Sequence, residues 1–364
     1  MKKLVIDARE SGTSTGRYVD KLIEHLYELK SPYRVTVLTT SQRLEFMCKL
    51  VPRFEVIESR YKEFTFAEQI GLLRQLQKIK PDLVHFPMIQ QPILYQGHVV
   101  TTMQDLTTVR FRNPSKNWLV FTLKQQVYKF VTYWAAHKSA RVMTPSEYVK
   151  ADVARYTRIN SRKVTVTLEA ADAISDPPEP ITELEDKHFI MYVGRPQPHK
   201  NLERLIEAFA IMRQTNPDLY LVLAGKRDVL YRRLRKRTEL LGIKHVLFTG
   251  FVSEGQLRWM YEHTAAYIFP SLSEGFGLPG LEAMMHSAPV VSSDATCLPE
   301  IYKDAAVYFN PLDVAEIAST ISNVLVDVHL RKHLVARGKA VAGSYSWRRT
   351  AQQTLDVYKE VLGD

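Results

Sequence analysis

The chain alternates short apolar runs with longer amphipathic stretches, and this alternation occurs twice, on either side of a proline cluster. Apolar runs of about 4–8 residues are typical of buried strands, and a period of about 3.6 residues is typical of helices. Strands that alternate with helices favour parallel sheets, because each parallel pair needs a crossover connection. The sequence therefore predicts an α/β protein with two such units.

The expected elements fall into two groups of similar size. The first group has strands at residues 4–9, 34–38, 82–86, 99–102 and 140–144, and helices at residues 17–29, 66–79, 115–137 and 146–156. The second group has strands at residues 188–193, 219–224, 246–249, 266–269, 289–292 and 306–309, and helices at residues 202–213, 229–241, 253–262, 278–285, 313–327, 329–343 and 347–362.

A proline cluster separates the two groups. Pro177, Pro178 and Pro180 fall within four residues, and an acidic stretch follows them. Proline cannot continue a helix or a central strand, because it lacks the backbone N–H and has a fixed φ. We therefore expect an N-terminal domain over residues 1–175, a linker over residues 176–186 and a C-terminal domain over residues 187–345. Two Rossmann-like domains of this kind would face each other across a cleft.

Composition excludes several classes of protein. The 364 residues are 45% hydrophobic and 24% charged, so the chain can bury large cores and is not disordered. No apolar run reaches the roughly 18 residues of a membrane-spanning helix, and the apolar start of the chain ends at Asp7, too early for a signal peptide. Cys48 and Cys297 are too few for a zinc site or a disulfide framework. We expect a cytoplasmic protein.

The net charge of +10 is concentrated in the first half of the chain. Residues 1–180 hold 27 Lys and Arg against 18 Asp and Glu, and residues 106–146 hold seven basic residues and no acidic one. Aromatic side chains interleave with the cations over residues 110–141. Such a helix could lie on an anionic membrane surface, or it could be a core helix with a solvated basic face. Nucleic acid is not expected as a partner, because no recognition motif accompanies the charge.

The loop and helix at residues 271–285 carry the most informative motif. Gly275 and Gly277 let the backbone approach a ligand closely, and they follow an apolar strand. Pro279 suits the first turn of a helix, where exposed N–H groups bind anionic or hydroxyl-rich ligands. Glu274 and Glu282 lie eight residues apart, one before the helix and one within it. The two carboxylates could therefore contact one bound molecule at different points.

The stretch 271–285 resembles the Glu-x7-Glu signature of retaining glycosyltransferases of family 4, which have the GT-B fold. The other segments that agree with that family in order and spacing are residues 192–202, 248–252, 292–300, 6–9 and 16–18. The resemblance extends along nearly the whole chain and is strongest in the second half. It implies two Rossmann-like domains facing across a cleft, with a final helix, residues 346–364, that packs back on the N-terminal domain.

The resemblance also implies a donor-binding site in the C-terminal domain. Arg195 and Lys200 would bind the nucleotide diphosphate, since guanidinium and ammonium groups pair well with phosphate oxygens. Glu282 would accept hydrogen bonds from the ribose hydroxyls, and Glu274 would hold the sugar.

Backbone groups would complete this site. The N–H groups of Phe276 and Gly277 would hold the sugar together with Glu274. Leu278 would close on the diphosphate at the helix start, and Val252 lies where the family binds the edge of the base. Gly16 corresponds to the glycine loop of the first domain.

The resemblance further implies the type of reaction. Retaining transfer in such enzymes is thought to need no protein nucleophile, so the protein must position both substrates and stabilise the departing charge. No metal and no cofactor are implied, since Arg195, Lys200 and helix N-termini supply positive charge. The donor would be a nucleotide-diphosphate sugar, with GDP-mannose favoured over UDP-sugars by family frequency only. The acceptor would be a glycan or a lipid-linked molecule, and the protein would be cytoplasmic, either free or peripheral on the inner face of the membrane.

The chain departs from the family at one position. The family commonly has His-Asp-Leu after a first-domain strand, and here Gln104 stands in place of the histidine. Glutamine donates and accepts hydrogen bonds but cannot carry a proton. Either the histidine acts only by hydrogen bonding and Gln104 replaces it, or the chain is a degenerate GT-B protein that binds a nucleotide sugar or a partner enzyme. His85 is a candidate substitute, or else a sheet-end histidine held by packing.

Overall fold

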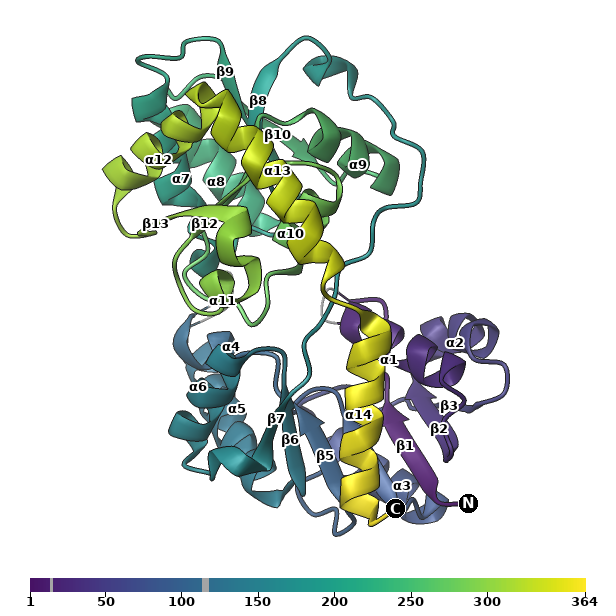
Figure 1. Ribbon diagram of the computed structural model, residues 1–364. Helices are drawn as coiled ribbons and strands as arrows, with labels where there is room; N and C mark the ends of the chain where they lie inside the picture. Colours follow the sequence, from purple (N-terminus) through teal and green to yellow (C-terminus); the bar gives the residue numbers. More distant parts are fainter. Residues whose placement is uncertain (14–15, 113–117) are drawn as a thin grey trace. The chain divides into compact units, whose positions relative to one another are not determined.

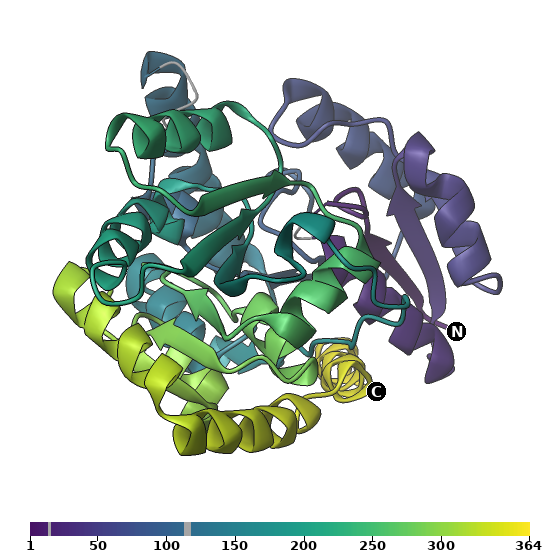
Figure 2. The same cartoon turned by 90° about the horizontal axis from the view of Figure 1, so that it is seen from above.

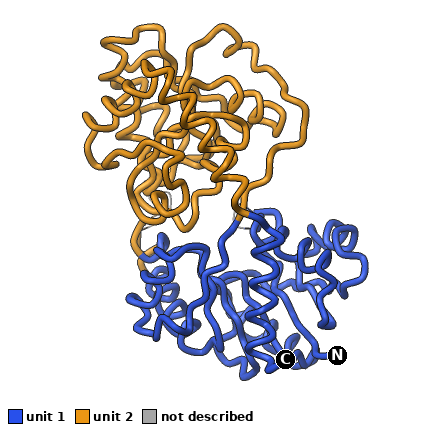
Figure 3. Tube along the Cα trace, viewed as in Figure 1, with its two compact units in different colours: residues 1–109, 123–169, 346–364 blue, residues 110–122, 170–345 orange. Residues whose placement is uncertain are grey.

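A computed structural model describes residues 1–13, 16–112 and 118–364. The chain divides into two compact units (Figure 3), each built around one parallel sheet (Figure 1). Unit 1 comprises residues 1–109, 123–169 and 346–364, and unit 2 comprises residues 110–122 and 170–345. The expected α/β class with two Rossmann-like domains is confirmed.

The sheet of unit 1 has seven strands in the order β3-β2-β1-β4-β5-β6-β7. Its strands are β1 (Lys3–Asp7), β2 (Arg34–Thr39), β3 (Glu55–Glu58), β4 (Leu83–Phe86), β5 (Val99–Thr102), β6 (Arg141–Thr144) and β7 (Val164–Val166). Strands β3 and β7, which are the two edge strands, were not among the strands expected from the sequence. An edge strand is only partly buried, so β3 can begin and end with glutamate and lacks the apolar run that marks a central strand.

Helices connect these strands and cover the sheet of unit 1. They are α1 (Gly16–Glu28), α2 (Leu44–Leu50), the π-helical segment η2 (Glu68–Leu72), α3 (Leu73–Ile79), α4 (Thr107–Arg110), α6 (Glu147–Thr157) and α14 (Trp347–Leu362). The long helix α5 (Trp118–Lys138) begins in a segment assigned to unit 2 and continues into unit 1. The expected start of this helix, Ser115, lies outside the described residues.

The last helix of the chain, α14, belongs to unit 1 and lies against α1 (Figure 1), and Figure 2 shows it end-on. Its Tyr358 hydroxyl is 2.6 Å from His85 Nδ1, and His85 Nε2 is 2.8 Å from Thr102 Oγ1. Trp347 packs against Tyr18 of α1 with their ring centroids 6.3 Å apart. Buried hydrogen bonds and aromatic contacts therefore hold the end of the chain on the first sheet.

The sheet of unit 2 has six strands in the order β10-β9-β8-β11-β12-β13. Its strands are β8 (His188–Val193), β9 (Leu219–Ala224), β10 (Val246–Gly250), β11 (Ala266–Phe269), β12 (Val290–Ser293) and β13 (Ala306–Phe309). Its helices are α7 (Leu202–Met212), α8 (Val229–Leu240), α9 (Glu254–His263), α10 (Leu278–Met285), α11 (Leu298–Tyr302), α12 (Val314–Val326) and α13 (Val328–Gly343). Figure 2 shows helices on both faces of this sheet, as its near-continuous apolar strands require.

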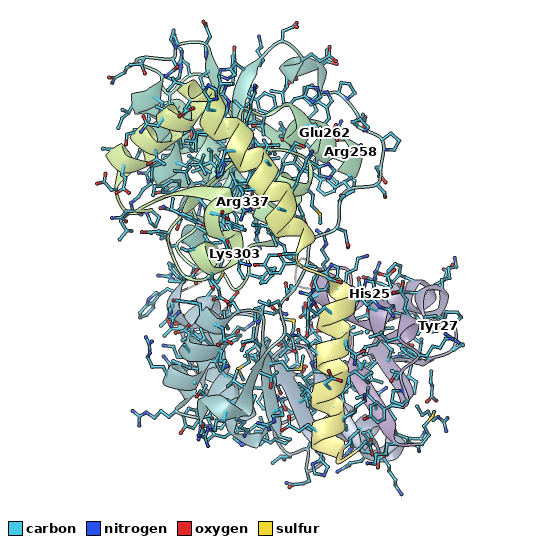
Figure 4. All side chains as sticks on the ribbon, in the orientation of Figure 1. His25, Tyr27, Arg258, Glu262, Lys303 and Arg337 are labelled. Atoms are coloured by element: carbon cyan, nitrogen blue, oxygen red, sulfur yellow. The ribbon has the colours of Figure 1, made fainter. Side chains whose placement is uncertain are left out.

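The boundary between the units differs from the predicted one. It falls between Glu169 and Ala170, so residues 176–186, which were expected to be a linker, belong to unit 2. Helix α9 holds this segment: the Glu179 N–H donates to the Gly255 carbonyl, and Arg258 donates to the Asp176 carbonyl at 3.0 Å. Arg258 and Glu262 also lie side by side on α9 (Figure 4), with Nε 2.8 Å from Oε1. Proline stops a helix here, but side-chain and backbone hydrogen bonds still fix the segment.

The helices of residues 1–13, 16–112 and 118–364 include none that is both long enough and apolar enough to span a bilayer.

Candidate active site

The carboxyl ends of β8 and β11 mark the point where the strand order of the second sheet reverses. Open parallel sheets bind ligands at such a point, because the loops after the two strands diverge to opposite faces and leave a crevice. The loop after β8 carries Arg195 and Lys200, and the loop after β11 carries Glu274 and Gly277. The predicted donor-site residues on these two loops therefore lie at the same edge of one sheet.

Lys200 and Glu274 form an ion pair between the two loops, with Nζ 2.6 Å from Oε1. Their side chains are only 21% and 12% exposed, so water screens the pair weakly. The backbone ties the same loops together, because the Leu272 N–H donates to the His199 carbonyl at 2.7 Å. A cation and a carboxylate are thus held side by side at the reversal point, where an anionic, hydroxyl-rich ligand would meet both.

Arg195 pairs with Asp228, a residue that sequence analysis did not single out. Asp228 caps α8 by accepting from the N–H groups of Leu230 at 2.9 Å and Tyr231 at 3.0 Å. Burial acts to raise the pKa of Asp228, but the N–H groups and the Arg195 guanidinium outweigh it and lower the pKa. An acidic residue directly before an amphipathic run is a known helix-start signal, but only the folded chain reveals that it also holds Arg195.

Helix α10 begins in the geometry expected of a ligand-binding turn. Gly277 has a φ of 94°, and a Cβ there would lie 2.5 Å from the Tyr302 hydroxyl oxygen, so only glycine fits. The Tyr302 hydroxyl donates to the Gly277 carbonyl at 2.5 Å. Leu278 and Pro279 form the first turn, and Phe276 packs edge-on against Tyr345 with ring centroids 5.4 Å apart. These contacts hold the turn at the start of α10, where the first N–H groups of a helix point beyond its end.

Glu282 is 7% exposed and lies in the second turn of α10. Val252 is further from the reversal point, because it follows β10, the edge strand two places away from β8. The structure thus groups Arg195, Lys200, Glu274 and the α10 turn around two adjacent strands. Val252 stands at the end of the same sheet edge.

Gly16 and Gln104 belong to unit 1. Gly16 opens α1, and a Cβ there would lie 1.9 Å from the Glu10 carbonyl oxygen, so the preceding loop requires glycine. Gln104 follows β5 at the carboxyl edge of the first sheet. Its Nε2 is buried and, among the described residues, has no hydrogen-bond partner.

Glu169 is a buried carboxyl group that sequence analysis missed. It follows β7, is 4% exposed, and its Oε1 has no hydrogen-bond partner within the part of the chain that the structure describes. Burial raises the pKa of Glu169 to about 7, against the opposing effects of the Gln104 amide and the Arg17 guanidinium. No local pattern distinguishes a buried glutamate from a solvated one, so the sequence carries no signal for it.

We expect Glu169→Gln to stabilise the protein at alkaline pH. The pKa of Glu169 is about 7 in the folded chain and 4.5 as a free group, so the unfolded chain releases this proton first as the pH rises. Stability is therefore full below the unfolded pKa and falls between the two values, by on the order of 3 kcal/mol. The amide has no proton to lose, so the melting-temperature difference between variant and wild type should grow from about pH 4.5 to about pH 8.

Thermal melts over that pH range test the prediction. Glu239→Gln, on the exposed face of α8, controls for the loss of one negative charge from the chain. A melting-temperature difference that stays constant with pH would show that Glu169 titrates like a solvated glutamate.

His85 is a structural residue. It is fully buried between the Tyr358 hydroxyl and Thr102 Oγ1, and burial lowers its pKa to about 3. A histidine that stays neutral and is enclosed on both ring nitrogens cannot exchange a proton with a substrate near pH 7. His85 therefore does not substitute for the histidine that Gln104 replaces.

Two family models match adjoining parts of the chain. Residues 15–173 match Glycosyltransferase Family 4, and residues 176–341 match glycosyl transferases group 1. This chain belongs to glycosyltransferase family 4. The resemblance drawn from residues 271–285 is thereby confirmed for the family and the fold.

Relatives of this chain include proteins that are named mannosyltransferases. O-antigen chain mannosyltransferase B of Escherichia coli is 30% identical over 231 residues, which are 60% of this chain and 60% of that protein. The serotype-specific mannosyltransferase WbdA of Escherichia coli is 32% identical over 230 residues, which are 60% of this chain but 28% of WbdA. The match thus spans less than two thirds of the length of either relative.

Solved structures share the fold over the full chain. Sucrose-phosphate synthase from Thermosynechococcus elongatus superposes with a TM-score of 0.75 at 17% identity, covering 100% of both chains. HepE from Anabaena, solved in complex with UDP and glucose, superposes with a TM-score of 0.74 at 15% identity, covering 99% of this chain and 100% of HepE. At 15–17% identity, the similarity to these structures shows the GT-B fold alone.

Proposed function

We propose that this protein is a retaining glycosyltransferase that moves mannose from GDP-mannose to a glycan or lipid-linked acceptor. The observation that carries the proposal is the Lys200–Glu274 pair beside the Gly277 turn, at the reversal point of the second sheet. A cation, a carboxylate and the N-terminus of a helix at one edge match what a nucleotide-diphosphate sugar offers for recognition: its phosphates, its hydroxyl groups and the negative charge that develops as the diphosphate leaves.

Each group has a role in the proposed reaction. Lys200 and Arg195 bind the diphosphate and stabilise its charge as it leaves, together with the N–H groups at the start of α10. Glu274, held by Lys200, accepts hydrogen bonds from the sugar hydroxyls, and Glu282 accepts them from the ribose. The leaving diphosphate takes the proton of the acceptor hydroxyl on the same face of the sugar, so anomeric configuration is retained. The proposed reaction requires neither a metal ion nor a cofactor.

The choice of mannose as the sugar rests on the relatives, and the choice of guanine as the base rests on the frequency of GDP-mannose in the family. Several relatives at about 30% identity are named mannosyltransferases, and two of them are named O-antigen chain mannosyltransferases, which supports mannosyl transfer in polysaccharide synthesis. HepE was solved with UDP and glucose, and its likeness to this chain is one of fold, so UDP-sugars are the alternative donors to be tested. The site proposed here binds the diphosphate common to both.

A thermal-shift screen tests the donor. GDP and GDP-mannose should raise the melting temperature, and UDP, ADP and their sugars should do so less, because stabilisation follows affinity for the folded state. Arg195→Ala should weaken binding of the stabilising nucleotide by about tenfold or more, the cost of one charge-assisted contact to phosphate. Calorimetry measures that loss directly.

Arg235→Ala is the matched control, since Arg235 is an exposed arginine of the same domain that pairs with Glu239 on α8. Unchanged nucleotide affinity in the Arg195→Ala variant would show that the diphosphate does not bind at the loop after β8. Stabilisation by no nucleotide at all would refute the proposed function.

A further inference from the structure

A small pocket lies in unit 1, at the carboxyl edge of the first sheet, where the strand order reverses between β1 and β4. Open parallel sheets bind ligands at such a point, because the loops after the two strands diverge and leave a crevice. We call it the unit 1 pocket, and the residues that line it include Asp7, Arg9, Glu10, Glu63, Met88 and Gln90. The diphosphate site proposed above belongs to unit 2, so this pocket is a different site.

The unit 1 pocket has room for one small polar group. Its volume is about 10 Å³, which is close to the space that a single water molecule needs. A hydroxyl group fits into such a space, whereas a phosphate group or a whole sugar ring is too large for it. A ligand would therefore insert one hydroxyl group and lie with its remaining atoms outside the pocket.

Gln90 shows which kind of polar group the pocket accepts. Its side chain is 6% exposed, and its Nε2 donates to Glu10 Oε1 at 3.3 Å. Its Oε1 is buried and accepts no hydrogen bond from residues 1–13, 16–112 or 118–364. A buried carbonyl oxygen without a donor is unfavourable, because it has lost its hydrogen bonds to water. A ligand O–H group that donates to Gln90 Oε1 would remove this cost.

The charged groups of the pocket repel anions. Its lining contains the carboxyl groups of Asp7, Glu10 and Glu63 and the guanidinium of Arg9. Arg9 is already engaged, because it donates to Asp7 at 2.7 Å and to Glu68 at 2.8 Å. Burial raises the pKa of Glu10, and the neighbouring charge of Glu63 raises it further. The negative charge of the lining therefore favours hydrogen-bond donors and disfavours a phosphate or a carboxylate.

We propose that the unit 1 pocket binds a hydroxyl group of an uncharged sugar and discriminates against sugars that carry phosphate or carboxylate. The hydroxyl group can donate to Gln90 Oε1 or to a carboxylate of the lining, whereas an ionised group has no proton to donate and meets like charge. A site whose buried polar groups need a donor rejects ligands that lack one, because those groups then stay unpaired. A water molecule would also satisfy Gln90, but its loss would not change sugar affinity.

This site defines the class of acceptor for the proposed transferase. With the donor bound in unit 2, a sugar held by unit 1 is the acceptor, and this step rests on the proposed function. The acceptor would then end in a neutral sugar, and not in a lipid phosphate or a sugar acid. An earlier glycosyl transfer must supply such an end, so the protein would extend a glycan and not begin one. Sugar binding itself does not depend on the proposed function.

Saturation-transfer NMR on the full chain, without nucleotide, tests the proposal. The neutral probes are the methyl glycosides of mannose, glucose and galactose, and the anionic probes are the 6-phosphates and uronates of the same sugars. At least one neutral probe should bind, and its anionic counterparts should bind about tenfold or more weakly. Gln90→Met keeps the length of the side chain but removes the amide, and it should weaken binding of the neutral probe by about tenfold.

Glu63→Gln should narrow the discrimination between a neutral sugar and its anionic counterparts by about threefold or more, and mainly at low salt. Glu63 is partly exposed, so this variant tests the proposal even if Gln90→Met fails to fold. Glu45→Gln is the matched control, since Glu45 is an exposed glutamate of unit 1 that pairs with Lys49 on α2. The control removes the same charge from the same unit and should leave both affinities unchanged.

Three results would overturn the proposal. One is unchanged sugar affinity in a folded Gln90→Met variant, because the pocket would then hold only water. The others are equal binding of neutral and anionic probes, and binding of no neutral probe at all. Nucleotide affinity, measured in each variant, should match that of the wild type. Sugar binding in a wild-type protein that no nucleotide stabilises would refute the proposed function and leave the unit 1 pocket standing.

Discussion

Lys200→Ala is expected to lower kcat/KM for sugar transfer by about a hundred- to a thousandfold. The substitution removes a charge-assisted contact to the diphosphate, which costs roughly 1.5–3 kcal/mol, and it also leaves Glu274 without its partner. Glu274 is 12% exposed and lies 2.6 Å from the Lys200 ammonium, so its charge would be poorly solvated and its side chain free to turn away from the sugar. Steady-state kinetics with the donor found in the thermal-shift screen measure the loss.

A double-mutant cycle tests whether Lys200 and Glu274 act as a coupled pair or as two independent contacts. Glu274→Ala should lower mainly turnover, because a sugar contact that strengthens during transfer is felt in kcat. The double variant should lose little more than the worse single variant, since each residue holds the other in place. The exposed pair Arg235 and Glu239 on α8 provides the control cycle, with an expected coupling of at most about 0.5 kcal/mol. Fully additive losses at Lys200 and Glu274 would mean that the two residues act separately.

Gln104→Ala is expected to reduce transfer by about ten- to a hundredfold, the scale of one or two lost hydrogen bonds. Gln104 follows β5 at the carboxyl edge of the first sheet, and its amide acts on the buried carboxyl group of Glu169. Gln104→His should remain active. Gln104→Glu should be worse than Gln104→Ala, because it would add a second carboxylate next to the buried Glu169.

The same series distinguishes an enzyme from a degenerate GT-B protein. Wild-type transfer rates in the Gln104→Ala variant would show that this residue has no role. A wild-type protein that binds its nucleotide but transfers no sugar, and that gains activity on Gln104→His, would favour the degenerate protein. The intact Lys200–Glu274 pair leads us to expect an active wild type.

The sequence was sufficient for the features that short segments determine. Central strands such as β8 and β11 are uniform apolar runs, and the turn at Gly277 and Pro279 combines residues that few other conformations accept. The family resemblance implied one donor-binding site for Lys200 and Glu274, and a parallel sheet brings the ends of β8 and β11 to one edge, where the two residues pair. Strands β3 and β7 escaped detection because edge strands need no continuous apolar run.

Tertiary structure alone decided how the side chains are paired and which helix sides remain exposed to solvent. The pairing of Arg195 with Asp228, the burial of Glu169 and the enclosure of His85 by Tyr358 join residues that are far apart in the chain, and no local pattern encodes such contacts. The same holds for α5, whose two apolar sides look alike in the sequence. Only packing shows that Val131 and Ala135 face the core while Leu123 and Phe130 face solvent, because burial depends on which elements the fold brings alongside a helix.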